Sequence, residues 1–377
     1  MKDDARTAAL PHLPSLDGLR TLAVVLTSLI HLEPDLVPGG FIGVDVFFVL
    51  SGFLITSILL REHALTGRLD LRRFYVRRAR RLLPAVLALM AVFGLVTVLL
   101  TPTVRDLVVA AVTFGGVMTY TMNWASVVGH DVPWQVDHLW SLSVEEQFYL
   151  LWPLVLIFFL PRVRRRTLLA LTLAGVALST VAQAVVFDGT HSVSIAYEAS
   201  PLHAQGILIG CAVAQVFARR PDPTVAFEWF GRRSWTTWLG LAALGAMAVG
   251  LDLDHRPAYN GGILLASVAA AVVVVGLISQ DMAGRDSTVR RWFSSAPMVA
   301  LGKRSYSIYL WQNFMAWALT PLLRDSLLWV PANVVATLAA AELSYRFVER
   351  RWMSPRPPRA TRTPRRQPTH RAADALR

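Results

Sequence analysis

The chain has 377 residues, of which 54% are hydrophobic and 16% charged, and its mean hydropathy is +0.46. A soluble protein of this size could not bury so much apolar surface, so the composition indicates a protein that crosses the membrane several times. The net charge of +12 comes from arginines between apolar segments and in the tail, a distribution that favours cytoplasmic loops and lipid headgroups over nucleic acid.

Apolar segments long enough to cross a bilayer recur along the chain. They lie at 17–33, 41–60, 83–100, 105–124, 139–160, 167–187, 201–218, 235–251, 261–279, 303–323 and 328–347. Arginines cluster at 61–81, 162–166, 219–233, 285–304 and after 346, which places these parts in the cytoplasm. An odd number of crossings must separate 61–81 from the external linker 126–138, so we expect 105–124 to insert only partly.

The sequence therefore predicts an all-α integral membrane protein with about ten transmembrane helices, one re-entrant segment and both termini in the cytoplasm. Residues 1–12 form a cytoplasmic segment without a signal-peptide pattern, and 13–353 form the transmembrane domain. The tail 354–377 is rich in arginine and proline, so we expect it to be disordered and to lie against lipid headgroups.

The first apolar segment carries two ionisable residues, Arg20 and His31, eleven positions apart. At about 100° per residue they fall on nearly the same helix face, roughly 16 Å apart along the axis. Ionisable side chains within a bilayer are energetically unfavourable and indicate function by default. The pair therefore predicts a site that works along the membrane normal.

The second span contains Asp45 near its outer end and Ser51 in mid-membrane. Asp45 is either a structural charge stabilised by the helix dipole or part of the functional site. The sequence does not favour either interpretation over the other.

The basic segment LDLRRFYVRRARRLLPA follows, and Pro84 suits the start of the next span. Its arginines are too dense for a transmembrane helix: Arg72, Arg73, Arg77, Arg78, Arg80 and Arg81. They either reach toward lipid headgroups or form a cradle for the phosphates of a cytosolic ligand, since guanidinium groups bind phosphate bidentately.

The segment DHLWSLSVEEQFYLLWP places His138, Ser141 and Glu145 on one helix face. Glu145 and Glu146 inside an apolar helix require a partner or a bound proton, and a structural ion pair with an arginine is the alternative to a functional role. No metal is expected. The linker before His138 lacks standard ligand spacing, and Cys211 is the only cysteine.

These segments resemble the membrane acyltransferase-3 family of sugar O-acyltransferases over about residues 13–353. The matching runs are LDGLRTLAVVLTSLIH, GGFIGVDVFFVLSGFLIT, FYVRRARRLLPA, HLWSLSVEEQFYLLWP, LGKRSYSIYLW and ELSYRFVERRW. The resemblance implies a ten-helix protein of the bacterial cell membrane. It would pass an acyl group, often acetyl, from cytosolic acyl-CoA to a hydroxyl of a carbohydrate, glycolipid or glycoside of the cell envelope. No bound cofactor is implied.

The resemblance also assigns residues. The Arg-x10-His pair of the family falls on Arg20 and His31, and its Arg-x-x-Arg motif best fits Arg78 and Arg81, although Arg77 and Arg80 share the spacing. The family glutamate falls on Glu145 or Glu146. Many relatives carry an extracytoplasmic esterase-like domain, so a separate acyl-accepting partner is expected if this chain does not complete the transfer itself.

The expected mechanism has three parts. Arg20, Arg77, Arg78 and Arg81 hold the donor phosphates, and the pantetheine arm extends through the bundle interior toward His31. A neutral imidazole takes the acceptor proton or carries the acyl group, while Glu145, Glu146 or Asp45 fixes its tautomer. Accessory or acceptor-side residues complete the expected site: Ser51, His138, Ser141 and Tyr309.

Three positions depart from the family pattern: His203 and Gln205 where arginine and aspartate are common, and Gln312 where histidine usually follows YLW. We expect these changes to alter donor or acceptor selectivity, and they keep a non-catalytic binding relative open. A secondary transporter is the other rival, although no internal duplication or paired interrupted helices support it.

Overall fold

The computed structural model describes residues 12–100, 103–189, 193–218 and 228–353. The tail 354–377, nearly all of the N-terminal segment 1–12 and most of the arginine cluster 219–233 lie outside the described residues. Within the described ranges all regular elements are helices, and no strand occurs. The all-α class predicted from the sequence is confirmed.

The first half of the chain supplies the helices that surround the site. They are α2 (Pro14–Leu32), α3 (Ile42–Thr66), α4 (Leu71–Leu100), α5 (Val104–Met118), α6 (Met122–Val127), η1 (Asp137–Leu139), α7 (Trp140–Phe159) and α8 (Arg165–Val186).

The second half begins with short helices and ends with two long ones. They are α9 (Val193–Glu198), α10 (Gln205–Phe217), α12 (Glu228–Arg232), α13 (Ser234–Gly250), η3 (Ala258–Gly262), α14 (Ile263–Met282), α15 (Thr288–Phe293), α16 (Ala296–Leu323), α17 (Trp329–Ser344), η4 (Tyr345–Glu349) and α18 (Arg350–Met353).

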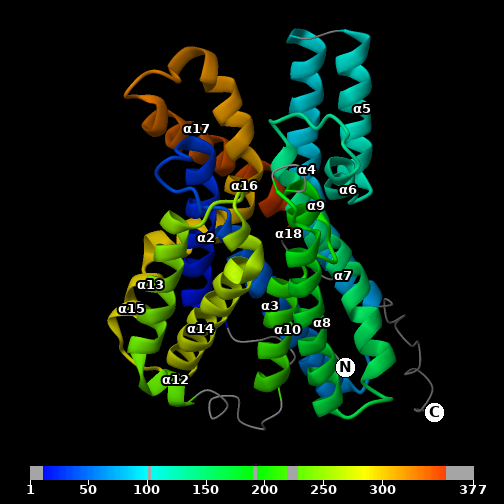
Figure 1. The fold of residues 1–377 in the computed structure, drawn as a ribbon, viewed down its shortest axis with the longest axis vertical. Coiled ribbons are helices and arrows are strands. Elements are labelled where there is room, and N and C mark those ends of the chain that lie inside the picture. Colours follow the sequence, from blue (N-terminus) through cyan, green and yellow to red (C-terminus); the bar gives the residue numbers. More distant parts are fainter. Residues whose placement is uncertain (1–11, 101–102, 190–192, 219–227, 354–377) are drawn as a thin grey trace, which may run out of the picture.

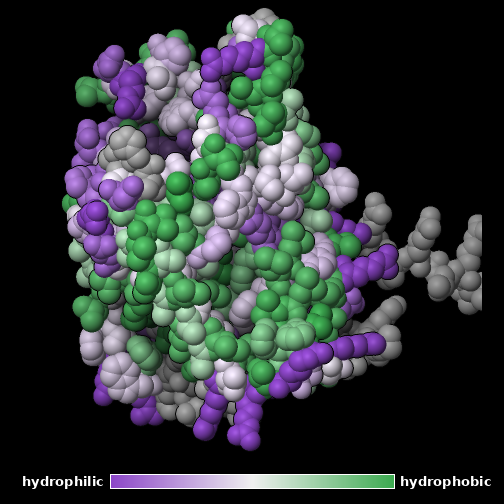
Figure 2. Space-filling view, turned by 45° about the vertical axis from the view of Figure 1, so that its right-hand side comes forward, coloured by the Kyte–Doolittle hydropathy of each residue, from purple (hydrophilic) through white to green (hydrophobic). Residues whose placement is uncertain are grey.

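Six stretches of the described chain are long and apolar enough to cross a membrane: α2, α3, α4, η1 with α7, α8, and η3 with α14. Apolar side chains cover the flank of the molecule, and long hydrophilic side chains gather along its lower edge (Figure 2). The protein is therefore a multi-pass membrane protein. The count of ten crossings stays a prediction.

The two ends of the molecule differ (Figure 1). The α4–α5 and α16–α17 pairs project at one end, while α8, α10 and α12 reach the opposite end. The ends of these last helices adjoin the arginine clusters 162–166 and 219–233. The positive-inside rule predicts that this second end faces the cytoplasm.

Helix α3 is the centre of the bundle and packs against α2, α10 and α14. Its crossing with α10 brings the two backbones into direct contact. A Cβ added to Gly52 would lie 2.0 Å from the Ile207 carbonyl oxygen, and one added to Gly210 would lie 2.1 Å from that of Val49. Glycine is therefore required at both positions, as is common where membrane helices approach closely.

Helix α2 lies between α3 and α16, which fixes the position of its ionisable residues. A Cβ on Gly302 of α16 would lie 1.7 Å from the Asp17 carbonyl oxygen of α2, so these helices also touch through their backbones. Arg20 and His31 are thereby held on a rigid element.

Two expected boundaries were wrong. Pro84 lies inside α4 instead of starting a span, because the basic segment continues as helix from Leu71. The segment 105–124 is broken at Tyr120, whose φ is 57° and whose carbonyl accepts a hydrogen bond from Gln147 at 2.6 Å. The resulting α5 has 15 residues, or about 22 Å, which is too short to cross alone. This break agrees with the partial insertion predicted for 105–124.

Candidate active site

A cavity of about 570 Å³ opens among α2, α3, α4, α7 and α16. We call it the arginine cavity. Five arginines line it, Arg20 from α2 and four from α4: Arg73, Arg77, Arg78 and Arg81. Three carboxylates face them: Asp17, Glu62 and Glu145. The cavity is therefore electropositive.

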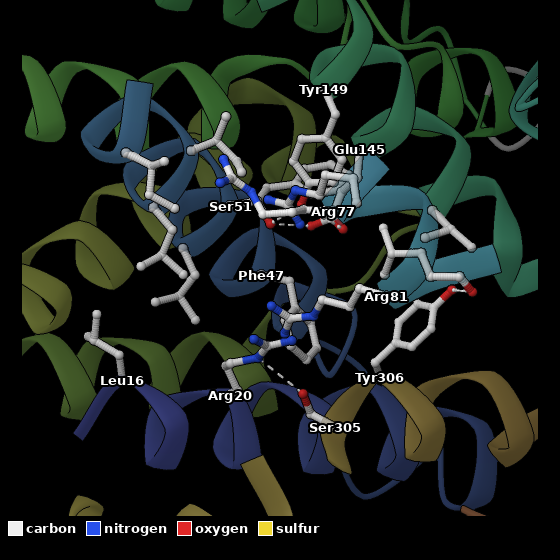
Figure 3. Close-up of a pocket in the computed structure, with 18 of the residues that line it drawn as sticks. Leu16, Arg20, Phe47, Ser51, Arg77, Arg81, Glu145, Tyr149, Ser305 and Tyr306 are labelled. Atoms are coloured by element: carbon white, nitrogen blue, oxygen red, sulfur yellow. Dashed lines mark hydrogen bonds between the residues drawn. The ribbon is translucent and has the colours of Figure 1, made fainter. Parts of the chain in front are cut away.

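These guanidinium groups are not neutralised by ion pairs. No carboxylate oxygen of the described chain lies within 4.0 Å of any of the five. Arg20 instead donates to Ser305 Oγ at 3.2 Å, and Arg78 lies 3.9 Å over the Tyr149 ring. Arg20 and Arg81 reach toward each other from opposite walls (Figure 3). Like charges placed this way favour a bound anion, and planar guanidinium donors suit phosphate.

The structure also separates the two Arg-x-x-Arg pairs that the sequence left open. Arg77, Arg78 and Arg81 line the cavity, whereas Arg80 is exposed and is not part of its wall. Arg81 lies four residues after Arg77 and three after Arg78, so these three side chains can line the same space.

Glu145 lines the arginine cavity and accepts the last hydrogen bond of a short chain. Tyr149 donates to Ser51 Oγ at 2.9 Å, and Ser51 donates to Glu145 Oε1 at 2.6 Å. Glu146 is buried on another face of α7, does not line the cavity, and its Oε1 has no hydrogen-bond partner. Of the two glutamates, only Glu145 lines the arginine cavity.

Three expected accessory residues meet at the inner wall of the arginine cavity. Ser141 and Tyr309 line it, and Ser141 donates to the Tyr309 oxygen at 2.5 Å. Tyr309 in turn donates to the His138 carbonyl at 2.7 Å. The His138 ring lies behind Tyr309, with 5.1 Å between ring centroids, and both its nitrogens are buried without a partner.

His31 does not line the arginine cavity, so the structure does not show the single interior corridor that was expected. It lines a second cavity of about 180 Å³ between α2, α16 and α17, which we call the His31 cavity. Neighbouring residues of α16 separate the two spaces, because Tyr309 lines the first and Ile308 lines the second. The helix face predicted for Arg20 and His31 therefore passes from one cavity to the other.

The group that fixes the His31 tautomer also differs from the expectation. Nδ1 of His31 lies 2.6 Å from the Thr27 carbonyl oxygen. A carbonyl only accepts, so Nδ1 carries the proton and Nε2 keeps its lone pair. The Thr27 carbonyl, one helical turn before His31, thus fixes the imidazole tautomer. This role was expected of Glu145, Glu146 or Asp45.

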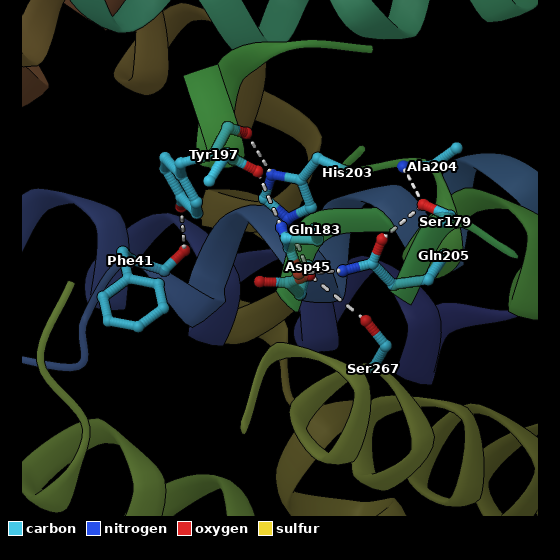
Figure 4. Close-up of polar contacts among 10 residues, drawn as sticks. Phe41, Asp45, Ser179, Gln183, Tyr197, His203, Ala204, Gln205 and Ser267 are labelled. Atoms are coloured by element: carbon cyan, nitrogen blue, oxygen red, sulfur yellow. Dashed lines mark hydrogen bonds and ion pairs between the residues drawn. The ribbon is translucent and has the colours of Figure 1, made fainter. Parts of the chain in front are cut away.

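Asp45 belongs to a different cluster near α10 and α14 (Figure 4). Its Oδ1 accepts from His203 Nε2 at 3.1 Å and from Ser267 Oγ at 3.1 Å. All three side chains are buried. The contacts of Asp45 are thus with these residues and not with His31, which favours the structural interpretation of this residue.

The departures from the family pattern are accommodated locally. His203 keeps Asp45 paired, and its Nδ1 donates to the Tyr197 carbonyl at 2.6 Å. Gln205 bonds Gln183 at 2.9 Å and Ser179 at 2.8 Å. Gln312 is different in kind, because it lines the His31 cavity.

A polar network outside the spans joins α6, α7 and α9. Asn123 donates to the Glu198 carbonyl at 3.1 Å and to Ser200 at 3.0 Å, and Ser200 donates to Gln147 at 2.5 Å. Burial raises the pKa of the Glu198 carboxyl to about 7. This network fastens the loop that leads to His203.

Several cavity residues were missed from the sequence. Ser305 and Tyr306 lie in the matched run LGKRSYSIYLW, and Tyr149 lies in the matched run HLWSLSVEEQFYLLWP. Helical spacing could have found Tyr149, which stands four residues after Glu145. No sequence signal shows that α16 faces α4 across a cavity.

Comparison with known proteins supports these motifs. Residues 13–345 match the acyltransferase domain family. The chain is 34% identical over 360 residues to the peptidoglycan O-acetyltransferase OatA of Listeria monocytogenes, covering 90% of this chain and 55% of that protein. It is 32% identical over 363 residues to the O-acetyltransferase OatA of Staphylococcus aureus, covering 90% of this chain and 57% of that protein. The chain thus spans little more than half of either relative. No solved structure matches it.

Proposed function

Because the chain belongs to the acyltransferase-3 family, we propose that it transfers an acetyl group from cytosolic acetyl-CoA to a hydroxyl of a cell-envelope glycan. The family membership makes it an acyltransferase of the membrane. The O-acetyl chemistry and a peptidoglycan acceptor come from the names of the relatives. Neither a transporter nor a non-catalytic relative is favoured by any observed feature of the site.

The arginine cavity is the observation that carries the proposal. It places unpaired guanidinium groups of α4 beside the end of the molecule where the arginine clusters lie. Coenzyme A carries several phosphate groups and an apolar arm. Arg20, Arg78 and Arg81 would hold the phosphates, and the apolar side chains of α3 that share the wall would contact the arm.

His31 would act as the general base. Its Nε2 lone pair takes the proton of the acceptor hydroxyl while that oxygen attacks the thioester carbonyl carbon. The C–S bond then breaks, the acetyl group stays on the oxygen, and the thiolate leaves and receives the proton from the imidazolium. The Thr27 carbonyl favours this step because it stabilises the Nδ1 proton throughout.

For this attack the acetyl thioester, still attached to the pantetheine arm, must pass the wall between the two cavities. Tyr309, Ser141 and His138 form this wall on the side of the arginine cavity. Rotation of the Tyr309 ring would join the two spaces. We therefore assign these three residues to the path of the acetyl group and not to donor binding.

The test uses the protein in lipid nanodiscs with radiolabelled acetyl-CoA and a soluble peptidoglycan fragment. We expect saturable acetyl-CoA binding and acetyl transfer. His31→Ala should keep the binding and lose transfer by about 10²- to 10⁴-fold, the usual contribution of a general base. His255→Ala, an exposed histidine of an unrelated loop, is the matched control. Wild-type transfer by His31→Ala, or the absence of acetyl-CoA binding, would refute the proposal.

A further inference from the structure

The His31 cavity faces the lipid. None of the described residues that line it is an acidic side chain, a lysine or an arginine. Val25 of α2 and Val334 and Leu338 of α17 form its rim and are 43%, 44% and 38% exposed on the apolar flank. The mouth of the cavity therefore opens sideways between α2 and α17, where a bilayer would cover it.

Two buried amide atoms in this cavity have no hydrogen-bond partner: Nε2 of Gln312 and Oδ1 of Asn333. Gln312 is 5% exposed and Asn333 1%. The Asn333 amide nitrogen donates to the Trp329 carbonyl at 2.9 Å, so its oxygen must be the free acceptor. Ser28 Oγ lies 2.5 Å from the Gln312 amide and 2.8 Å from the Val24 carbonyl oxygen, and whichever of the two it donates to, the Gln312 NH₂ group keeps at least one free N–H.

One free donor and two free acceptors, Asn333 Oδ1 and Nε2 of His31, match two neighbouring hydroxyl groups, because each hydroxyl donates one proton and also accepts. Buried polar atoms without partners are unfavourable, so this arrangement is explained by a ligand that satisfies them. Apart from the hydroxyl side chains of Thr21, Ser28 and Thr337, the rest of the wall is apolar and includes Leu29, Leu301 and Ile308. The ligand must therefore combine a hydroxyl with an apolar body.

We propose that the His31 cavity binds a membrane lipid with a sugar headgroup, which enters sideways between α2 and α17. One sugar hydroxyl donates to Nε2 of His31 and accepts from Gln312, a neighbouring hydroxyl donates to Asn333 Oδ1, and the alkyl chain remains in the bilayer. This inference rests on the proposed function for the chemistry that follows binding: the hydroxyl proton passes to His31, and the oxygen receives the acetyl group as the C–S bond breaks. Gln312, a departure from the family pattern, thereby becomes a residue that selects the acceptor.

The binding test does not require activity. A dodecyl glucoside that carries a diazirine on its chain is photolysed with the protein in nanodiscs, and the labelled peptides are mapped. We expect label on α2 or α17, with competition by unlabelled dodecyl glucoside. Val334→Trp should reduce this label at least tenfold by filling the mouth. Val335→Trp should not, because Val335 is 67% exposed on the same helix and is not part of the cavity wall.

The activity test compares glucose with hexyl and dodecyl glucoside as acceptors of labelled acetyl groups. Acetylation should be at least tenfold faster with the dodecyl than with the hexyl compound, because the longer chain concentrates the sugar in the bilayer. Gln312→Ala should raise the KM for dodecyl glucoside at least tenfold and leave acetyl-CoA binding unchanged. Gln215→Ala is the matched control, a buried glutamine of α10 that bonds Thr172.

The outcomes separate the two proposals. Specific label at α2 or α17 without any acetyl transfer would remove the enzymatic proposal and leave the lipid site. Equal label in Val334→Trp and Val335→Trp, or label that dodecyl glucoside does not displace, would overturn the lipid site. Acetylation that is equally fast with glucose and with dodecyl glucoside would also overturn it while supporting the transferase.

Discussion

Arg81→Gln tests whether the arginine cavity holds the phosphates of the donor. Arg81 lines the cavity, faces Arg20 and has no carboxylate within 4.0 Å in the described chain. A hydrogen bond to a charged group contributes about 1.5–3 kcal/mol. Loss of one arginine–phosphate contact should therefore weaken acetyl-CoA binding roughly 10- to 150-fold. The neutral side chain also relieves repulsion from Arg20, so the lower end of this range is expected.

The matched control is Arg80→Gln. Arg80 is the next residue before Arg81 on α4 and carries the same charge, but it is not part of the cavity wall. Equilibrium binding of acetyl-CoA in nanodiscs, at one fixed salt concentration, measures both variants. If Arg80→Gln and Arg81→Gln weaken binding equally, the effect is one of overall charge, and the donor site is not where the structure places it.

Three further predictions concern stability, measured as thermal unfolding in nanodiscs. Gly52→Ala should destabilise the protein by about 1–3 kcal/mol because its Cβ would overlap α10, whereas Gly94→Ala, with nothing within 4 Å, should be neutral or stabilising by about 0.5–1 kcal/mol. His203→Ala should cost about 3–5 kcal/mol, since it leaves Asp45 buried without its partner; a loss below 1 kcal/mol would contradict the pairing. The pKa of Glu198 is raised in the folded state to about 7. The protonated carboxyl therefore makes its full contribution to the free energy of unfolding below pH 4.5, and this contribution is lost as pH rises through 7. Glu198→Gln should therefore remove this loss and be the more stable protein at pH 8, with no advantage at pH 4.5.

The sequence predicted the class of the protein and most of one cavity. Apolar length and arginine position predict spans and their direction because both follow from the properties of the bilayer. Glu145 could be named because charge inside apolar helices is rare, whereas Arg78 and Arg81 were selected from the basic segment by the family resemblance. The separation of His31 from the arginines could not be predicted. Helical spacing gives the face of α2, but only the packing of α16 against it shows that one face borders two cavities.

The departures from the family pattern show two ways in which a membrane protein tolerates substitution. His203 can replace the arginine that is common in the family because Asp45 needs a positively charged partner or a hydrogen-bond donor. The His203 ring supplies one, since its Nε2 lies 3.1 Å from Asp45 Oδ1. Gln312 lies in the wall of the His31 cavity, where a substitution changes which groups can bind or take a proton. A neutral amide cannot take a proton from the acceptor, so in this chain His31 is the one imidazole among the residues that line its cavity. Gln312→His would place a second base there. If the Gln312 amide selects the acceptor by donating a hydrogen bond, Gln312→His should still bind acetyl-CoA but should acetylate alkyl glucosides more slowly. The pH dependence of transfer should then reflect two titrating imidazoles in place of one.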